Sequence, residues 1–150
     1  MGDLAYAKSF RELVVYQKAR QMQREIFQIS KTFPRDEMFS LTDQIRRSSR
    51  SVGANIAEAW AKRRYDKHFL SKLTDADGEQ FETQHWIGTA LECEYIEQSQ
   101  AKVLVDMCAE VGRLLGGMMA KAEIFCGEEY KVTRESPAEY FANSIDKTGY

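Results

Sequence analysis

Proline and cysteine are both scarce in this chain of 150 residues. Only Pro34 and Pro137 occur, so a stretch of about a hundred residues lacks the strongest helix breaker. The cysteines Cys93, Cys108 and Cys126 are odd in number and form no C-x-x-C pair. This spacing predicts reduced thiols in a cytoplasm instead of a disulfide framework. Together these shortages favour an all-helical domain.

Long apolar runs and a large excess of one charge are missing as well. No uncharged apolar run approaches the about 18 residues of a membrane span, and the first residues lack the apolar core of a signal peptide. We therefore expect no membrane partner and a cytoplasmic location. The net charge of −2 and the pI of 5.8 argue against indiscriminate binding to nucleic acid, although a local basic face is compatible with them.

Residue patterns that carry chemistry are equally rare. The chain has two histidines, and only His85 belongs to a Glu-x-x-His motif, with Glu82. Because Tyr65 stands where His68 would need its glutamate, a di-iron pair of such motifs is impossible. No nucleophile elbow, phosphate-binding loop, dinucleotide fingerprint or zinc spacing occurs. We therefore predict no catalytic residue, no metal, no cofactor and no enzymatic activity.

Apolar residues recur at helical spacing through most of the chain. Four helices are expected, over about residues 10–31, 39–64, 67–95 and 100–126. The second carries an apolar stripe of Leu41, Ile45, Val52, Ile56 and Trp60. The fourth repeats every seven residues at Leu104, Val111, Met118 and Phe125, with Met107 and Leu114 between them. Short connections predict an all-α, antiparallel up-down four-helix bundle.

The ends of the chain differ from this pattern. Residues 1–9 form a lead-in, residues 10–126 the bundle, and residues 127–150 a polar tail that is expected to be mobile. A capping box with proline at the first helical position gives an alternative for residues 137–143, a short helix that docks on the bundle or on a partner.

The second and third helices have opposite charge. Residues 39–64 carry six basic and two acidic side chains, and residues 65–98 carry two basic and eight acidic ones. A short turn near Tyr65 brings together residues whose numbers sum to about 130, so Gly53 is expected to meet Gly78 in a close helix approach. Asn55 and Glu58 could share one helix face near this contact, where we expect them to satisfy backbone groups and not to perform catalysis.

The basic residues of the second helix allow two interpretations. Arg46, Arg47 and Arg50 would pair with the third helix, near Glu79 and Glu82, within a subunit or across an interface. Alternatively, they would contact nucleic acid. A second basic cluster, Lys62, Arg63 and Arg64, complements the dipole at the helix end or touches phosphates.

The chain has more apolar side chains than one core-facing stripe per helix can accommodate. Those outside the assigned stripes are Phe27, Val15, Trp60, Phe81, Trp86, Ile96 and Ile124. Because large exposed apolar patches mark interfaces, we expect the chain to associate with itself.

Two segments of the second helix resemble a known signature. Leu41 to Arg47 and Ser51 to Glu58 are similar to the motif of the 23S rRNA intervening-sequence proteins. Weaker similarities are Phe10 with Leu13, residues 16–19, Phe33-Pro34, residues 76–78 and residues 82–84, so that the resemblance covers about residues 9–126. Ala59 stands where the family has glycine, and Glu79 where it has serine.

The resemblance implies a bacterial up-down bundle that assembles into a ring-like homopentamer. A related accessory protein of diversity-generating retroelements binds nucleic acid and a reverse transcriptase. Its nucleic-acid binding goes with a strongly basic surface, which this acidic chain lacks. The biochemical role of most members is not established. Two functions are therefore expected: a non-enzymatic homo-oligomeric scaffold or adaptor for a protein partner and, as the alternative, a module that binds RNA or the ribosome through the basic face of the second helix.

Overall fold

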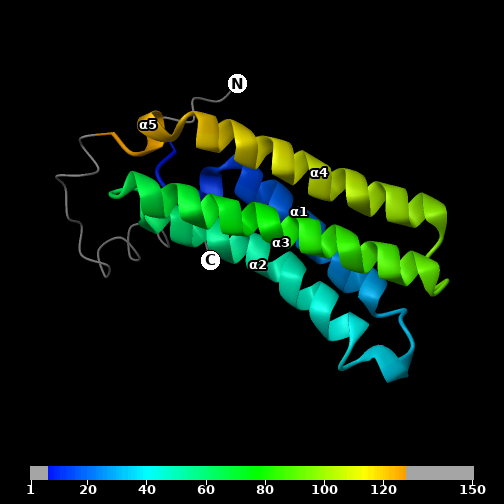
Figure 1. Ribbon diagram of the computed structural model, residues 1–150. Helices are drawn as coiled ribbons and strands as arrows, with labels where there is room; N and C mark the ends of the chain where they lie inside the picture. Colours follow the sequence, from blue (N-terminus) through cyan, green and yellow to red (C-terminus); the bar gives the residue numbers. More distant parts are fainter. Residues whose placement is uncertain (1–6, 128–150) are drawn as a thin grey trace.

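The computed structural model describes residues 7–127, which form helices and no strand. Four long helices are α1 (Val14–Ser30), α2 (Leu41–Ala61), α3 (Asp66–Glu92) and α4 (Gln98–Ala120). Short helices are the 3₁₀ turns η2 (Phe10–Glu12) and η3 (Arg35–Glu37) and the single turn α5 (Ala122–Phe125). Figure 1 shows the four long helices running side by side. The predicted all-α four-helix bundle is confirmed.

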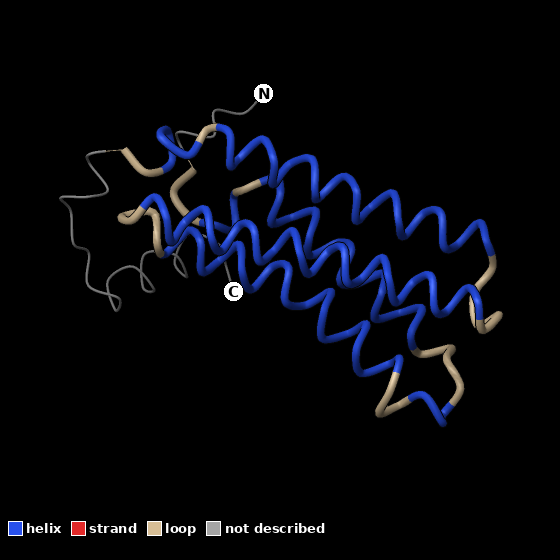
Figure 2. The backbone as a smooth tube through the Cα atoms, in the orientation of Figure 1, coloured by secondary structure: helices blue, strands red, loops and turns tan. Residues whose placement is uncertain are grey.

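Each long helix packs against the next one in the chain, and α4 packs back against α1. The loops that join them alternate between the two ends of the bundle (Figure 2). Since a short loop leaves the chain no room to cross the bundle, consecutive helices must be antiparallel neighbours. The contact between α2 and α3 is the most extensive of the four.

The core follows the predicted stripe of α2 closely. Leu41, Ile45, Val52, Ile56 and Trp60 are all buried. The assignment of Val15 and Ile96 to positions outside the stripes is wrong, since they are 4% and 6% exposed. Trp60 also stands among the surplus residues, but at 2% exposure it belongs to the stripe of α2. The apolar face of a bundle helix covers an arc of about 100° or more, so it admits residues beside a single line of contact.

Helix α4 buries its predicted heptad but differs in detail. Leu104, Val111, Met118 and Phe125 are at most 4% exposed. The second buried row of α4 consists of Cys108 and Leu115, which lie four residues after Leu104 and Val111. Met107 and Leu114, which the sequence placed in that row, are only partly buried. A seven-residue repeat is compatible with either row. The expected continuous helix to residue 126 is also wrong, because α4 ends at Ala120 and α5 follows after Lys121.

Side-chain contacts fix the register between α2 and α3. The hydroxyls of Ser48 and Thr83 lie 2.9 Å apart inside the bundle. Near the turn, Lys72 Nζ lies 2.8 Å from Glu58 Oε2. The residue numbers in each pair sum to about 130, as the length of the turn predicts.

The predicted meeting of Gly53 and Gly78 is wrong. A methyl group on Gly53 would lie 3.6 Å from the Tyr16 ring on α1, whereas one on Gly78 would meet nothing within 4 Å. Gly53 is therefore directed toward α1 and Gly78 toward solvent. The turn determines which residues of α2 and α3 lie at the same height along the bundle. The direction in which each side chain points depends on the rotation of its helix about the helix axis, and that rotation follows from the whole apolar stripe.

Two glycines of α4 allow a matched test of this packing. Gln80 is buried, donates to Asp77 and accepts from Gln84. A Cβ on Gly112 would lie 2.8 Å from Gln80 Nε2, while one on Gly116 would meet nothing within 4 Å. We expect Gly112→Ala to destabilise the fold by about 1–3 kcal/mol. Gly116→Ala should stabilise it by about 0.5–1 kcal/mol.

Urea titrations followed by circular dichroism measure both changes. Equal effects of Gly112→Ala and Gly116→Ala would contradict the contact between Gln80 and α4.

Residues 1–6 and 128–150 lie outside the described residues, and with them most of the lead-in, the predicted tail and its short helix at 137–143.

Candidate functional site

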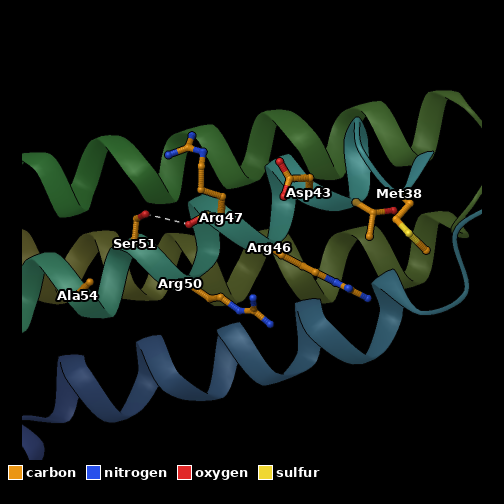
Figure 3. Close-up of a pocket in the computed structure, with 8 residues that line it drawn as sticks. Met38, Asp43, Arg46, Arg47, Arg50, Ser51 and Ala54 are labelled. Atoms are coloured by element: carbon orange, nitrogen blue, oxygen red, sulfur yellow. Dashed lines mark hydrogen bonds between the residues drawn. The ribbon is translucent and has the colours of Figure 1, made fainter. Parts of the chain in front are cut away.

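The outer surface of α2 carries three arginines at positions 46, 47 and 50. Steps of three and four residues place side chains on one helix face, so these residues line up along α2. In Figure 3, Arg47 points toward α3, whereas Arg46 and Arg50 point toward α1. The single basic face expected from the sequence is therefore divided into two flanks.

Arg47 joins α2 to the acidic helix. Its guanidinium group forms ion pairs with Glu82 and, at 3.6 Å, with Glu79. The Glu82 carboxylate also lies 3.4 Å from Trp86 Nε1. Since the arginine is partly exposed, each pair contributes at most about 1 kcal/mol, and its main effect is to hold α2 and α3 in register.

Arg46 and Arg50 do not pair with α3 of the same chain, so the prediction of pairing within one subunit is wrong for these two residues. Arg46 Nε donates to Ser30 Oγ at 2.7 Å, on α1. The two guanidinium groups lie 4.9 and 5.5 Å from the centroid of the Phe27 ring, and Lys31 Nζ lies 4.6 Å from it. Phe27, expected as a surplus apolar residue, is thus a platform for three cations.

A groove follows this face of α2. It has a volume of about 470 Å³, and its lining residues are Met38, Thr42, Asp43, Arg46, Arg47, Arg50, Ser51 and Ala54. Small side chains lie between the arginines, so the groove is open along the helix. Met38 and the adjacent Phe39, 49% and 90% exposed, add apolar surface at the start of α2.

The charges of the groove are unevenly compensated. Among residues 7–127, no carboxylate lies within 4 Å of the charged nitrogens of Lys31, Arg46 or Arg50. On the other flank, Arg47 is paired, and Asp43 points to the same side as Arg47 (Figure 3). The flank that faces α1 is therefore cationic, and the flank that faces α3 carries Arg47 against the carboxylates of Asp43, Glu79 and Glu82.

The second predicted basic cluster lies at the far end of α2. Arg63 stacks on the Trp60 ring at 3.5 Å and donates to the Trp60 carbonyl, and Arg64 lies 5.8 Å from the Tyr65 ring. Lys62 is exposed. Twelve residues of helix separate Lys62 from Arg50, a distance of about 18 Å. The six basic residues therefore do not form one site.

Asn55 and Glu58 have structural partners. Asn55 Nδ2 donates to the Ser51 carbonyl within α2. Glu58 forms an ion pair with Lys72, and this hydrogen bond and the charge of the carboxylate raise the pKa of Lys72. Asn55 therefore satisfies a backbone group as predicted, whereas for Glu58 that prediction is wrong, since its carboxylate pairs with a side chain of α3.

The outward face of α3 has a different character. Its exposed residues include a row without charged side chains, Thr74, Gly78, Phe81, His85 and Gly88, which we call the uncharged stripe; the exposed Asp75 lies beside this row. Phe81, at the centre of the stripe, is 60% exposed. The acidic residues Glu79 and Glu82 are turned toward α2, so the stripe has no charge of its own. Sequence analysis identified Phe81 as surplus but not the stripe around it, because that required the rotation of α3.

The Glu-x-x-His motif is engaged in other contacts. Glu82 binds Arg47 and Trp86, and the His85 ring lies 4.7 Å from the Trp86 ring. Among the described residues, no group of three or more histidine, cysteine, aspartate or glutamate side chains is placed to hold a metal ion.

Within the same residues, no helix is both long and apolar enough to span a bilayer.

The cysteines differ sharply in environment, which predicts selective reactivity. Cys93 is exposed, whereas Cys108 and Cys126 are buried. Burial raises the pKa of the Cys108 thiol to about 12, so it remains protonated at neutral pH. We expect a disulfide reagent to modify Cys93 rapidly in the folded protein and the other two thiols only after denaturation. Fast labelling that persists in Cys93→Ser would contradict this assignment.

The chain is similar to a known protein family and to a solved structure. Residues 11–117 match a family model described as 23S rRNA-intervening sequence protein. A solved structure from Bacteroides thetaiotaomicron VPI-5482, a protein with unknown function from the S23 ribosomal protein family, is similar at 29% identity and a TM-score of 0.66. The match covers 72% of this chain and 96% of that chain. No curated protein matches.

Proposed function

The chain belongs to the family of 23S rRNA-intervening sequence proteins, and from this premise we propose that it is a non-enzymatic homo-oligomeric scaffold or adaptor in the cytoplasm. In this role it assembles with copies of itself and presents bundle surfaces to a protein partner. The ring-like homopentamer implied by the family resemblance is the proposed assembly.

The uncharged stripe of α3 is the observation that supports this proposal. Phe81 is 60% exposed and is flanked along the helix by Gly78 and His85. Because Gly78 and Gly88 have no side chain, the backbone of a second helix can approach closely beside Phe81. An uncharged aromatic patch of this kind is typical of the centre of an interface, where charged residues are depleted.

Light scattering of the purified full chain tests the proposal. The expected result is a mass that is a multiple of 17.3 kDa and that does not change on moderate dilution. A mass of one chain at all concentrations would reject self-association and with it the scaffold role.

RNA binding is the second candidate, and the uncompensated cations Lys31, Arg46 and Arg50 favour it. A gel-shift titration with single-stranded RNA at increasing salt provides the test, since phosphate contacts weaken steeply with ionic strength. If RNA binds, Arg46→Ala with Arg50→Ala and Arg63→Ala with Arg64→Ala show which basic cluster contributes. No shift at low salt would reject this candidate.

A further inference from the structure

The groove on α2 has the form of a channel with two unlike flanks. Ser51 and Ala54 lie along its floor, and neither is large enough to fill it. Arg46 and Arg50 project to the α1 side, while Asp43 and Arg47 project to the α3 side (Figure 3). From Thr42 to Ala54 the channel follows about three turns of α2, or about 18 Å, and Met38 extends it into the turn before the helix.

The cationic flank is held in place before any ligand arrives. The Phe27 ring supports Lys31, Arg46 and Arg50, and the Ser30 hydroxyl fixes the guanidinium group of Arg46. Three positive charges around one ring repel one another, so a carboxylate placed between them would relieve that repulsion. Pre-organised guanidinium groups also lose little conformational freedom when they bind.

We propose that this channel binds an acidic amphipathic helix of a partner protein. The inference rests on the adaptor role proposed above and names the chemistry of the partner. Glutamates spaced three and four residues apart along one flank of the helix would face Arg46, Arg50 and Lys31. An apolar residue near one end would contact Met38 and Phe39, and small residues would face the floor at Ala54. This is the helix-in-groove mode of recognition.

The observations favour a protein segment over a polynucleotide. A phosphate backbone carries charge at every residue, and in this channel it would pass the carboxylate of Asp43 as well as the arginines. A helix can direct its carboxylates to one flank and leave the side that faces Asp43 uncharged. The exposed Met38 and Phe39 add an apolar contact that a protein side chain can use.

Fluorescence anisotropy with a defined peptide tests the inference on the full chain. The probe is a labelled helical peptide of about 18 residues made of glutamate, alanine and leucine, with glutamates on one flank and a leucine near one end. Binding should weaken at least about tenfold in the double variant Arg46→Gln and Arg50→Gln. It should weaken as much in Ala54→Trp, which fills the floor without changing any charge.

The matched control is Lys62→Gln with Arg64→Gln, which removes the same charge about 18 Å from Arg50 and about 12 Å beyond the end of the channel at Ala54. This variant should change binding less than about twofold. Circular dichroism checks that each variant keeps the helix content of the wild type. Equal weakening by both double variants, or equal binding of a scrambled peptide of the same composition, would overturn the inference.

Two further measurements separate the alternatives. An oligouridylate of about 18 nucleotides that binds more tightly than the peptide, and is lost in the Arg46 and Arg50 variant, would reassign the channel to nucleic acid and overturn the proposal. A change of oligomeric mass in Ala54→Trp would assign the channel to a second copy and overturn it too. If the peptide fails to bind but the wild-type mass is a multiple of one chain, only this inference fails and the scaffold role stands.

Discussion

Phe81→Asp is expected to reduce the mass of the assembly toward that of one chain, 17.3 kDa. Phe81 is 60% exposed at the centre of the uncharged stripe, so its replacement leaves the bundle core untouched. In an assembled interface the aspartate would lose its hydration without gaining a partner, and each subunit would add the same penalty. Aromatic residues at interface centres typically contribute about 2 kcal/mol or more to binding.

Phe39→Asp is the matched control for this experiment. Phe39 is 90% exposed, but it lies in the turn before α2 and not on the uncharged stripe. Light scattering of both variants should show a lower mass for Phe81→Asp alone. If Phe39→Asp dissociates the assembly and Phe81→Asp does not, the interface lies at the end of the bundle and the assignment to α3 is wrong.

Phe69→Ala is expected to destabilise the fold by about 3–5 kcal/mol. The Phe69 side chain is fully buried, and its ring stacks on Phe125 with centroids 5.8 Å apart. Truncation therefore leaves a cavity between α3 and α5 that neighbouring side chains cannot fill without strain.

Urea unfolding of Phe69→Ala and of Phe39→Ala compares a buried and an exposed phenylalanine of the same protein. Phe39→Ala should change the free energy of unfolding by less than about 0.5 kcal/mol. A loss below about 1 kcal/mol in Phe69→Ala would contradict the position of α5 against α3. The comparison is made at equal protein concentration, because self-association adds to apparent stability.

Sequence periodicity predicted the helices and most of the core because burial acts on side chains that recur at fixed angles. The stripe of α2 from Leu41 to Trp60 is buried as its spacing indicates. The register of α2 and α3 was also predictable, since a short turn leaves little freedom in how the two helices pair. Helix ends were less predictable: α4 stops at Ala120, where no proline or helix-ending glycine marks the break.

The rotation of each helix is what the sequence did not determine. The length of the turn indicates which residues of α2 and α3 lie at the same height along the bundle. That height alone suggested that Gly53 meets Gly78 and that Arg46, Arg47 and Arg50 all face the acidic helix. In the bundle only Arg47 faces α3, because one residue along α2 turns the side-chain direction by about 100°, whereas Arg50, four residues after Arg46, returns to the α1 flank. The platform at Phe27 depends on contacts between α1 and α2 that no local pattern encodes.

The mass of the wild-type full chain in solution, measured by multi-angle light scattering, tests the central claim most directly. Self-association through the uncharged stripe predicts a stable multiple of 17.3 kDa, and the ring implied by the family resemblance predicts about five times that value. A mass of 17.3 kDa at every concentration would contradict the account, because the exposed Phe81 would then be no interface and the scaffold would have no assembly.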